Sequence, residues 1–355
     1  MKILTLVLAL IAALSAEIDR ITSDPNAGRF RVEGHQIIGP DGEPFVPTGV
    51  NMLGPDAFFH EDGVTLGHAE VLREAWKVNT VRLNACVPEG CDYNDIHNER
   101  NDDLDAIVDE YTDAGIVVMI ALHQVEPGLW PTDAQLDRME AWWRDIARRY
   151  RHDPRVWFNL ANEPGSERPA KRRWLDMHAR LLGAIREEGA DNMVVVDGTR
   201  WGQESGDENA PTVATEDSAI LTWGPELKGS DDAVAFSFHV YNGWGHLPDD
   251  ASRDARLADF IDRIHRAGLA VLIGETGGDW EPCCSPKALA LHSVFRVAPP
   301  RGVGILMWHG QAIDEHKLVW DGRGESDPAM IDSWTDPTNL TWQGRLFWDH
   351  THAGG

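Results

Sequence analysis

Three consecutive segments decide the fold: IVVMIAL at residues 116–122, a long amphipathic stretch at 135–151, and VWFNLA at 156–161. The two outer segments are short and almost wholly apolar, which is typical of strands buried on both faces of a parallel sheet. The middle segment repeats apolar residues at helical spacing and stops before Asp153-Pro154. The stretch therefore predicts a strand–helix–strand unit with parallel strands.

The same alternation continues along the chain, and no linker or fixed repeat interrupts it. Eight such strands with intervening helices predict one closed (β/α)₈ TIM barrel. An open doubly wound sheet would need a glycine-rich phosphate turn after its first strand, and Asn51-Met52-Leu53-Gly54 is not one. The eight predicted strands are Phe45–Val50, Thr80–Leu83, Ile116–Leu122, Val156–Ala161, Met193–Val196, Val234–Tyr241, Leu269–Ile273 and Val303–Trp308.

The N-terminal region divides into two parts. Residues 1–15 combine Lys2, an apolar run and small residues, which predicts a secretory signal peptide and a secreted protein. The run is too short to span a bilayer, so no membrane contact is expected after cleavage. Residues 30–45 contain Asp41-Gly42 between apolar runs and predict a β-hairpin that closes the bottom of the barrel. The catalytic domain is then residues 16–355, with its core at about 30–348.

The amino-acid composition indicates which classes of molecule the protein can bind. The formal charge of −26 argues against nucleic acid and anionic membranes, because both would repel the protein. Fifteen Trp against four Tyr suits a protein that stacks on sugar rings, although most of these side chains are expected in the core. A neutral substrate and a monomer are expected.

Four cysteines allow three pairings. The short loop between Cys86 and Cys91 favours a disulfide there. The adjacent Cys283 and Cys284 then form a vicinal bridge or stay reduced.

Six of the predicted strands end in polar or aromatic residues or are directly followed by them. In a barrel these ends meet at one mouth, where the active site lies. One such residue could serve packing alone, whereas six strand ends together predict a functional site. Its candidate members are Arg82, His123, Asn162, Glu163, His239, Tyr241, Glu275 and Trp308.

Glu163 and Glu275 indicate the chemistry. Glycosidic bond cleavage needs one carboxylic acid to protonate the leaving oxygen and one carboxylate to attack the sugar or activate water. The two glutamates follow strands on nearly opposite sides of the predicted mouth. Arg82 is expected to keep Glu275 ionised, and Tyr241 to donate a hydrogen bond to it. Asn162 could bind a sugar hydroxyl, and Trp308 could form a stacking floor.

With these residues in this order, the chain resembles glycoside hydrolase family 5, from the Asp41-Gly42 hairpin to Trp308. The resemblance implies a retaining double displacement with Glu163 as general acid/base and Glu275 as nucleophile. It also implies that the other six strand-end residues surround the reacting sugar, and that no metal or organic cofactor takes part. Trp201 and Trp244, in loops after the fifth and sixth strands, are expected to line outer subsites.

The substrate stays open between mannan and cellulose or another β-glucan. The segments 194–203, 236–241 and 272–278 resemble bacterial β-1,4-mannanases, but the segments after Asn84 and after Trp308 depart from them. The expected activity is endo-β-1,4-glycanase on a β-linked polysaccharide or oligosaccharide. The alternatives are an exo-glycosidase or transglycosylase of the same family, or a barrel that binds carbohydrate without cleaving it.

Two other hydrolase classes receive less support. No Gly-x-Ser-x-Gly elbow of a serine hydrolase is present. His350 and His352 could suggest a metal hydrolase, but they are expected in a tail beyond the barrel.

Overall fold

The computed structural model describes residues 28–52, 66–87, 102–310, 315–320 and 336–353. The predicted signal peptide lies outside these residues. Among the described residues, no helix is both long enough and apolar enough to cross a membrane.

Eight parallel strands form a closed barrel in the order β10-β3-β4-β5-β6-β7-β8-β9, so the predicted fold class is confirmed. Two ladders shift register near their carboxyl ends, between Phe238 and His239 and between Ile305 and Met307. Such irregularities re-aim side chains at the mouth of a barrel. The strands are β3 Thr48–Met52, β4 Thr80–Ala85, β5 Val117–Leu122, β6 Val156–Asn159, β7 Val194–Asp197, β8 Val234–Val240, β9 Val271–Thr276 and β10 Gly304–Met307.

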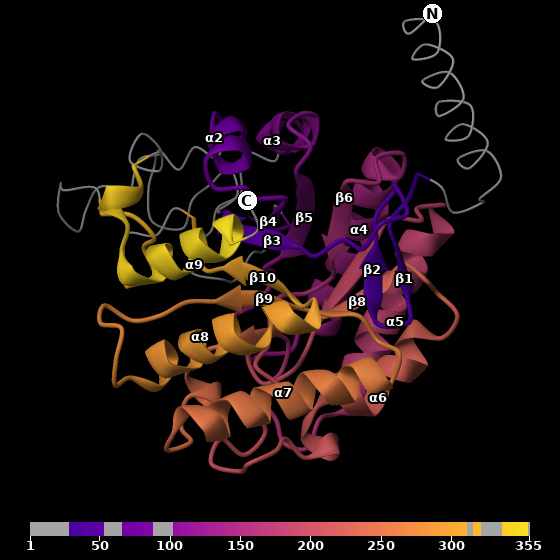
Figure 1. Ribbon diagram of the computed structural model, residues 1–355. Coiled ribbons are helices and arrows are strands. Elements are labelled where there is room, and N and C mark those ends of the chain that lie inside the picture. Colours follow the sequence, from indigo (N-terminus) through magenta and orange to yellow (C-terminus); the bar gives the residue numbers. More distant parts are fainter. Residues whose placement is uncertain (1–27, 53–65, 88–101, 311–314, 321–335, 354–355) are drawn as a thin grey trace, which may run out of the picture.

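Helices surround the barrel and bury their apolar sides against it (Figure 1). The helix predicted at 135–151 is α4, whose capping box joins Thr132 and Gln135 and satisfies two backbone N–H groups that helix geometry leaves unpaired. The helices are α2 Ala69–Glu74, α3 Asp102–Asp113, α4 Asp133–Tyr150, α5 Arg172–Glu187, α6 Ala219–Lys228, α7 Asp250–Arg266, α8 Pro286–Val297 and α9 Trp342–His352.

A hairpin forms in the predicted region from β1 (Arg31–Glu33) and β2 (Gln36–Ile38), which pair antiparallel. Its turn is Gly34-His35 and not the predicted Asp41-Gly42, which lies in the next turn, before a single bridge between Ile38 and Pro44. Phe30 packs edge-to-face on Trp157, with ring centroids 5.0 Å apart. The backbone N–H of Val32 donates to the carbonyl of Asp232, just before β8. The hairpin therefore covers the end of the barrel where the strands begin.

The prediction that His350 and His352 lie in a tail is wrong, because both belong to α9. Phe347 and Trp348 of this helix pack on Trp76, and His352 stacks on Trp348. These aromatic contacts hold α9 against the segment between α2 and β4.

Candidate active site

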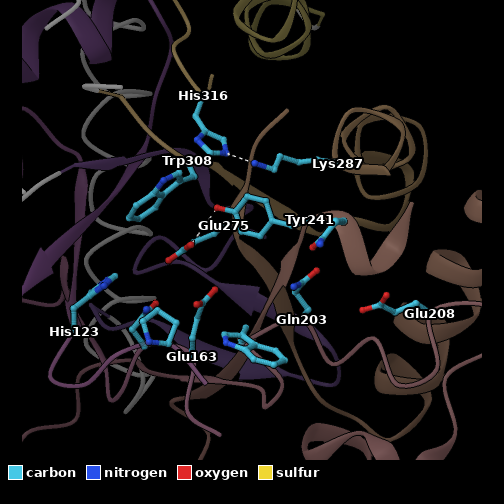
Figure 2. A pocket seen from close by; sticks show the side chains of 13 residues that line it. His123, Glu163, Gln203, Glu208, Tyr241, Glu275, Lys287, Trp308 and His316 are labelled. Atoms are coloured by element: carbon cyan, nitrogen blue, oxygen red, sulfur yellow. Dashed lines mark hydrogen bonds between the residues drawn. The ribbon is translucent and has the colours of Figure 1, made fainter. Parts of the chain in front are cut away.

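Glu163 and Glu275 face each other across the mouth of the barrel (Figure 2). Glu163 lies in the turn after β6, with a positive φ of 47°, and Glu275 lies within β9. Both side chains are buried, and a carboxylate oxygen of each lies within 4.8 Å of the other. The strand ends thus bring two carboxylates into one small site.

Positive and hydroxyl donors surround Glu275. Arg82 Nη1 donates to Glu275 Oε1 at 2.5 Å, and the Tyr241 hydroxyl donates to Oε2 at 3.2 Å. Burial and the charge of Glu275 raise the pKa of Tyr241 well above its usual value, so the phenol keeps its proton. Glu275 therefore accepts a hydrogen bond on each carboxyl oxygen, one of them from a guanidinium.

Glu163 has a different environment. Burial raises its pKa to about 7; a hydrogen bond with His239 opposes this shift, and the charge of Glu275 adds to it. His239 Nδ1 lies 2.6 Å from Glu163 Oε1. Glu163 therefore keeps its proton up to about neutral pH, whereas both carboxyl oxygens of Glu275 accept hydrogen bonds.

Arg82 is the centre of a buried polar network at the base of the site. Its side chain is fully buried and donates to Asn51, Asn159 and Asn162 at 2.8–2.9 Å. It also ion-pairs with Asp197 at 3.1 Å. Because each donor finds an acceptor, the guanidinium can be buried with its direction fixed.

Asn51, Asn159 and Asp197 were missed by the sequence analysis. Asp197 directly follows the predicted strand Met193–Val196, so the rule applied to the other strand ends would have found it. Asn159 lies within its strand and Asn51 near the end of β3. No sequence pattern around either asparagine distinguishes it from one that serves only the fold.

A pocket of about 570 Å³ opens above the two glutamates. His123 and Trp308 line it together, with their rings 6.3 Å apart and 24° from parallel. Burial and the nearby Arg82 hold the pKa of His123 well below its usual value, so this ring is neutral. The lining residues are His123, Pro127, Asn162, Glu163, Trp201, Gln203, Glu208, Tyr241, Asn242, Glu275, Lys287, Trp308 and His316.

Trp201 and Trp244 have different positions. Trp201 is 44% exposed and lines the pocket. The prediction for Trp244 is wrong: its ring is buried, contacts Phe238 and Phe260, and lies under the Arg256 guanidinium. The short helical turn Asn242–Trp244 directs the Trp244 ring back into the core. Trp244 Nε1 donates to the backbone carbonyl of Gln203.

A buried carboxylate anchors the loop that carries Trp201 and Gln203. Glu204 accepts hydrogen bonds from the backbone of Thr199, Ala219 and Ile220 and from the Ser218 hydroxyl. The acceptor sits at the first turn of α6, where backbone N–H groups lack helical partners. The loop then packs on His239: a Cβ at Gly202 would lie 2.7 Å from its Nδ1.

Lys287 and His316 add a second layer beside Tyr241 (Figure 2). Lys287 Nζ donates to Glu315 at 3.0 Å and lies 3.3 Å from His316 Nε2. The His316 ring packs edge-to-face on Tyr241 at 6.1 Å. Lys287 comes from the start of α8 and His316 from the segment after β10, so no strand pattern pointed to them.

Three of the four cysteines belong to the described residues, and none of these three lines the pocket. Cys86 is buried and disulfide-bonded. Cys91 lies outside the described residues, so its pairing with Cys86 stays a prediction. Cys283 and Cys284 are exposed free thiols, which is one of the two states expected for them.

One group of three side chains in the described part of the chain has atoms close enough to hold a metal ion: Glu163, His239 and Glu275. Glu163 lies at hydrogen-bonding distance from His239, and Glu275 accepts hydrogen bonds from Arg82 and Tyr241. We therefore assign these side chains to the proton and charge network rather than to a metal site.

The fold and the paired buried glutamates define a hydrolase of the (β/α)₈-barrel class. The family model described as "Cellulase (glycosyl hydrolase family 5)" matches residues 39–311. The chain belongs to this family.

Individual relatives are distant. The "Manganese dependent endoglucanase Eg5A" of Phanerodontia chrysosporium is 24% identical over 57% of this chain, which spans 52% of that protein. The "Mannan endo-1,4-beta-mannosidase" of Streptomyces lividans is 24% identical over 91% of the chain and 74% of the relative. The chain thus spans only about half the length of the first of these.

Two solved structures share the fold. A mannotriose complex of Thermomonospora fusca β-mannanase has a TM-score of 0.64 at 16% identity, covering 92% of this chain and 96% of that one. Thermobifida fusca endoglucanase Cel5A with cellotetraose has a TM-score of 0.66 at 18% identity, covering 92% and 97%.

Proposed function

We propose that this chain is a retaining endo-β-1,4-glycanase that hydrolyses mannan or a β-glucan through a glycosyl-enzyme intermediate. One observation carries the proposal: two buried carboxyl groups in different environments face each other, with an oxygen of one within 4.8 Å of an oxygen of the other. Retaining glycosidases hold their carboxyl groups about 5–5.5 Å apart, whereas inverting enzymes leave room for a water between them. The spacing favours direct attack by one carboxylate on the sugar.

The environments assign the roles. Glu275, next to Arg82 and Tyr241, is the nucleophile, because an ionised carboxylate is stabilised there. Glu163, with a pKa raised to about 7, is the general acid that protonates the leaving oxygen. Once the glycosyl-enzyme has formed, the ionised Glu163 removes a proton from the attacking water.

The pocket walls suit a neutral sugar. Trp308 offers an apolar face beside the glutamates, and Trp201 offers a second face at the rim. Asn162 Oδ1 accepts from Arg82, which directs the amide N–H groups toward other acceptors such as a sugar hydroxyl. A non-catalytic sugar-binding barrel would have no use for two buried carboxyl groups that face each other in such different surroundings.

The mode of action and the location belong to the same proposal. Endo cleavage is supported by the names of the relatives, an endoglucanase and a mannan endo-mannosidase. The apolar run near Lys2 supports export, and an oxidising compartment suits the disulfide at Cys86. We also propose that the enzyme acts on its polymeric substrate as a monomer.

The test is product analysis on mannan, glucomannan, carboxymethyl cellulose, mixed-linkage glucan and xylan. Proton NMR of the first product should show the β-anomer, and chromatography should show a ladder of oligosaccharides. Glu163→Gln and Glu275→Gln serve as matched controls that keep the shape of each side chain. A first product of α configuration would refute retention, and release of single sugars alone would refute endo cleavage.

A further inference from the structure

Asp197 is a buried carboxylate behind the catalytic pair and is absent from the residues that line the pocket. It ends β7. Its Oδ2 lies 3.1 Å from Arg82 Nη2 and 3.4 Å from His239 Nε2. Its Oδ1 accepts a hydrogen bond from Asn159 at 2.9 Å. These contacts place a third acidic group one layer below the sugar site.

The buried charges require a second cation. The charged or titratable groups around His239 are Arg82 from β4, His123 after β5, Glu163 after β6, Asp197 from β7, Tyr241 directly after β8 and Glu275 from β9. Arg82 supplies one positive charge, whereas Asp197 and Glu275 supply two negative ones. Because unbalanced charge is costly in a buried site, a protonated His239 restores neutrality when Glu163 carries its proton.

The geometry of the ring agrees with this count. His239 Nδ1 lies 2.6 Å from Glu163 Oε1, and Nε2 faces Asp197 on the other side of the ring. A neutral imidazole carries only one N–H, whereas an imidazolium carries two. Both nitrogens facing carboxyl groups therefore favours the charged ring.

We infer that Asp197 is a positioning residue that keeps His239 as an imidazolium, whose Nδ1–H occupies Glu163 Oε1 and leaves the acidic proton on Oε2 for the substrate. The inference rests on the proposed role of Glu163 as general acid/base. The imidazolium also stabilises the Glu163 carboxylate once its proton has passed to the leaving oxygen. Asp197 itself touches no substrate.

Asp197→Asn tests the inference through the pH dependence of kcat/KM on the polysaccharide. Removing a negative charge within a few ångströms makes the first proton of the Glu163–His239 pair leave at lower pH. The alkaline limb should move down by about one pH unit or more. On an aryl glycoside with an activated leaving group, which needs no acid, kcat/KM should fall several-fold less than on the polysaccharide.

Asn159→Ala is the matched control. Asn159 contacts both Asp197 and Arg82 but carries no charge. Its loss should lower kcat/KM at every pH and leave the alkaline limb in place. If Asp197→Asn behaved in the same way, with equal losses on both substrates and an unmoved limb, Asp197 would be a purely structural residue.

A measurement on the unaltered enzyme keeps the test decisive even if Asp197→Asn fails to fold. In ¹⁵N-histidine-labelled protein at pH 8, ordinary histidines are neutral, whereas His239 should show two protonated ring nitrogens. Its signals are assigned by their change in Glu163→Gln. A protein without an imidazolium at pH 8 would overturn the inference.

The two proposals fail separately. If Glu163→Gln and Glu275→Gln retained full activity, the proposed function itself would be wrong. If both lost activity while Asp197→Asn left the alkaline limb unmoved, only the role of Asp197 would be wrong.

Discussion

The same strands build both ends of the barrel interior, but one end is apolar and the other is charged. On a single strand, residues only two positions apart belong to different ends. On β6, Trp157 belongs to the apolar cluster near the hairpin, and Asn159 belongs to the Arg82 network. On β7, Val195 and Asp197 make the same change. Alternate residues of a strand point to the same face, so one step along the inner face leads from apolar to charged surroundings.

The comparison shows two ways of filling the same barrel. The end near the hairpin is stabilised by apolar burial, which needs no particular partner and tolerates changes of similar volume. At the mouth each buried charge needs an opposite charge and hydrogen bonds, so the arrangement is specific but contributes little net stability. The mouth should therefore govern activity, and the hairpin end should govern stability.

The largest expected effect is the loss of a catalytic carboxylate at the mouth. Glu275→Ala should lower kcat by about 10⁴-fold or more on every substrate, because the attacking group is gone. Azide should partly rescue it with inverted product. Glu163→Ala should still form the glycosyl-enzyme from activated aryl glycosides, and azide should give it retained product.

Product NMR and burst kinetics measure both variants. The reverse rescue pattern would exchange the two roles. Near wild-type activity in both would move the site elsewhere in the protein.

The next effect lies at the other end of the barrel. Trp157→Ala should lower the free energy of unfolding by roughly 3–5 kcal/mol, because a fully buried ring that packs on Phe30 and Phe45 is removed. The activity of each folded molecule should stay close to that of the wild type. Trp157→Phe, which keeps an aromatic ring, should cost less. Urea unfolding measures the free energy of unfolding, and active-site titration measures the activity per folded molecule. If Trp157→Ala also abolished the activity of the folded molecules, the two ends of the barrel would not have separate roles.

A smaller effect concerns pH. Glu163 has a pKa raised to about 7, so its acid form predominates below pH 7. For the polysaccharide, kcat/KM should fall about tenfold per pH unit above that value, since only the protonated form donates. An ordinary glutamic acid, with a pKa of about 4.3, would put this limb near pH 4. A pH profile of initial rates decides between them.

The smallest effect concerns the pocket rim. Trp201→Ala should raise KM for long oligosaccharides several-fold with little change in kcat, because a stacking face worth about 1 kcal/mol is lost. Trp280→Ala removes another exposed ring that does not line the described pocket and should leave KM unchanged. Trp308→Ala should instead lower kcat sharply. Similar small effects from Trp201 and Trp308 would mean that neither ring supports the sugar.

Most of the fold and the centre of the site followed from the sequence. Apolar strands carry their own signal, and the carboxyl ends of barrel strands must meet. The sequence pattern alone therefore places Glu163, His239 and Glu275 together at the mouth of the barrel.

The remaining differences depend on tertiary packing. The direction of the Trp244 ring is set by a turn that follows β8, and Lys287 reaches the pocket from the first turn of α8. His352 is the last residue of α9, and its ring stacks on Trp348 of the same helix, which packs on Trp76 far away in the sequence. None of these follows from periodicity.

The Glu204 anchor has a practical consequence for altering specificity. Because one buried acid ties Thr199, Ser218 and the start of α6 together, the chain between them can carry new side chains while its ends stay in register. A mutant library aimed at new polysaccharides should randomise Trp201 and Gln203 and keep Glu204 unchanged. Variants that alter Glu204 would mostly sample misplaced loops, and screening effort would be spent on folding defects instead of on substrate choice.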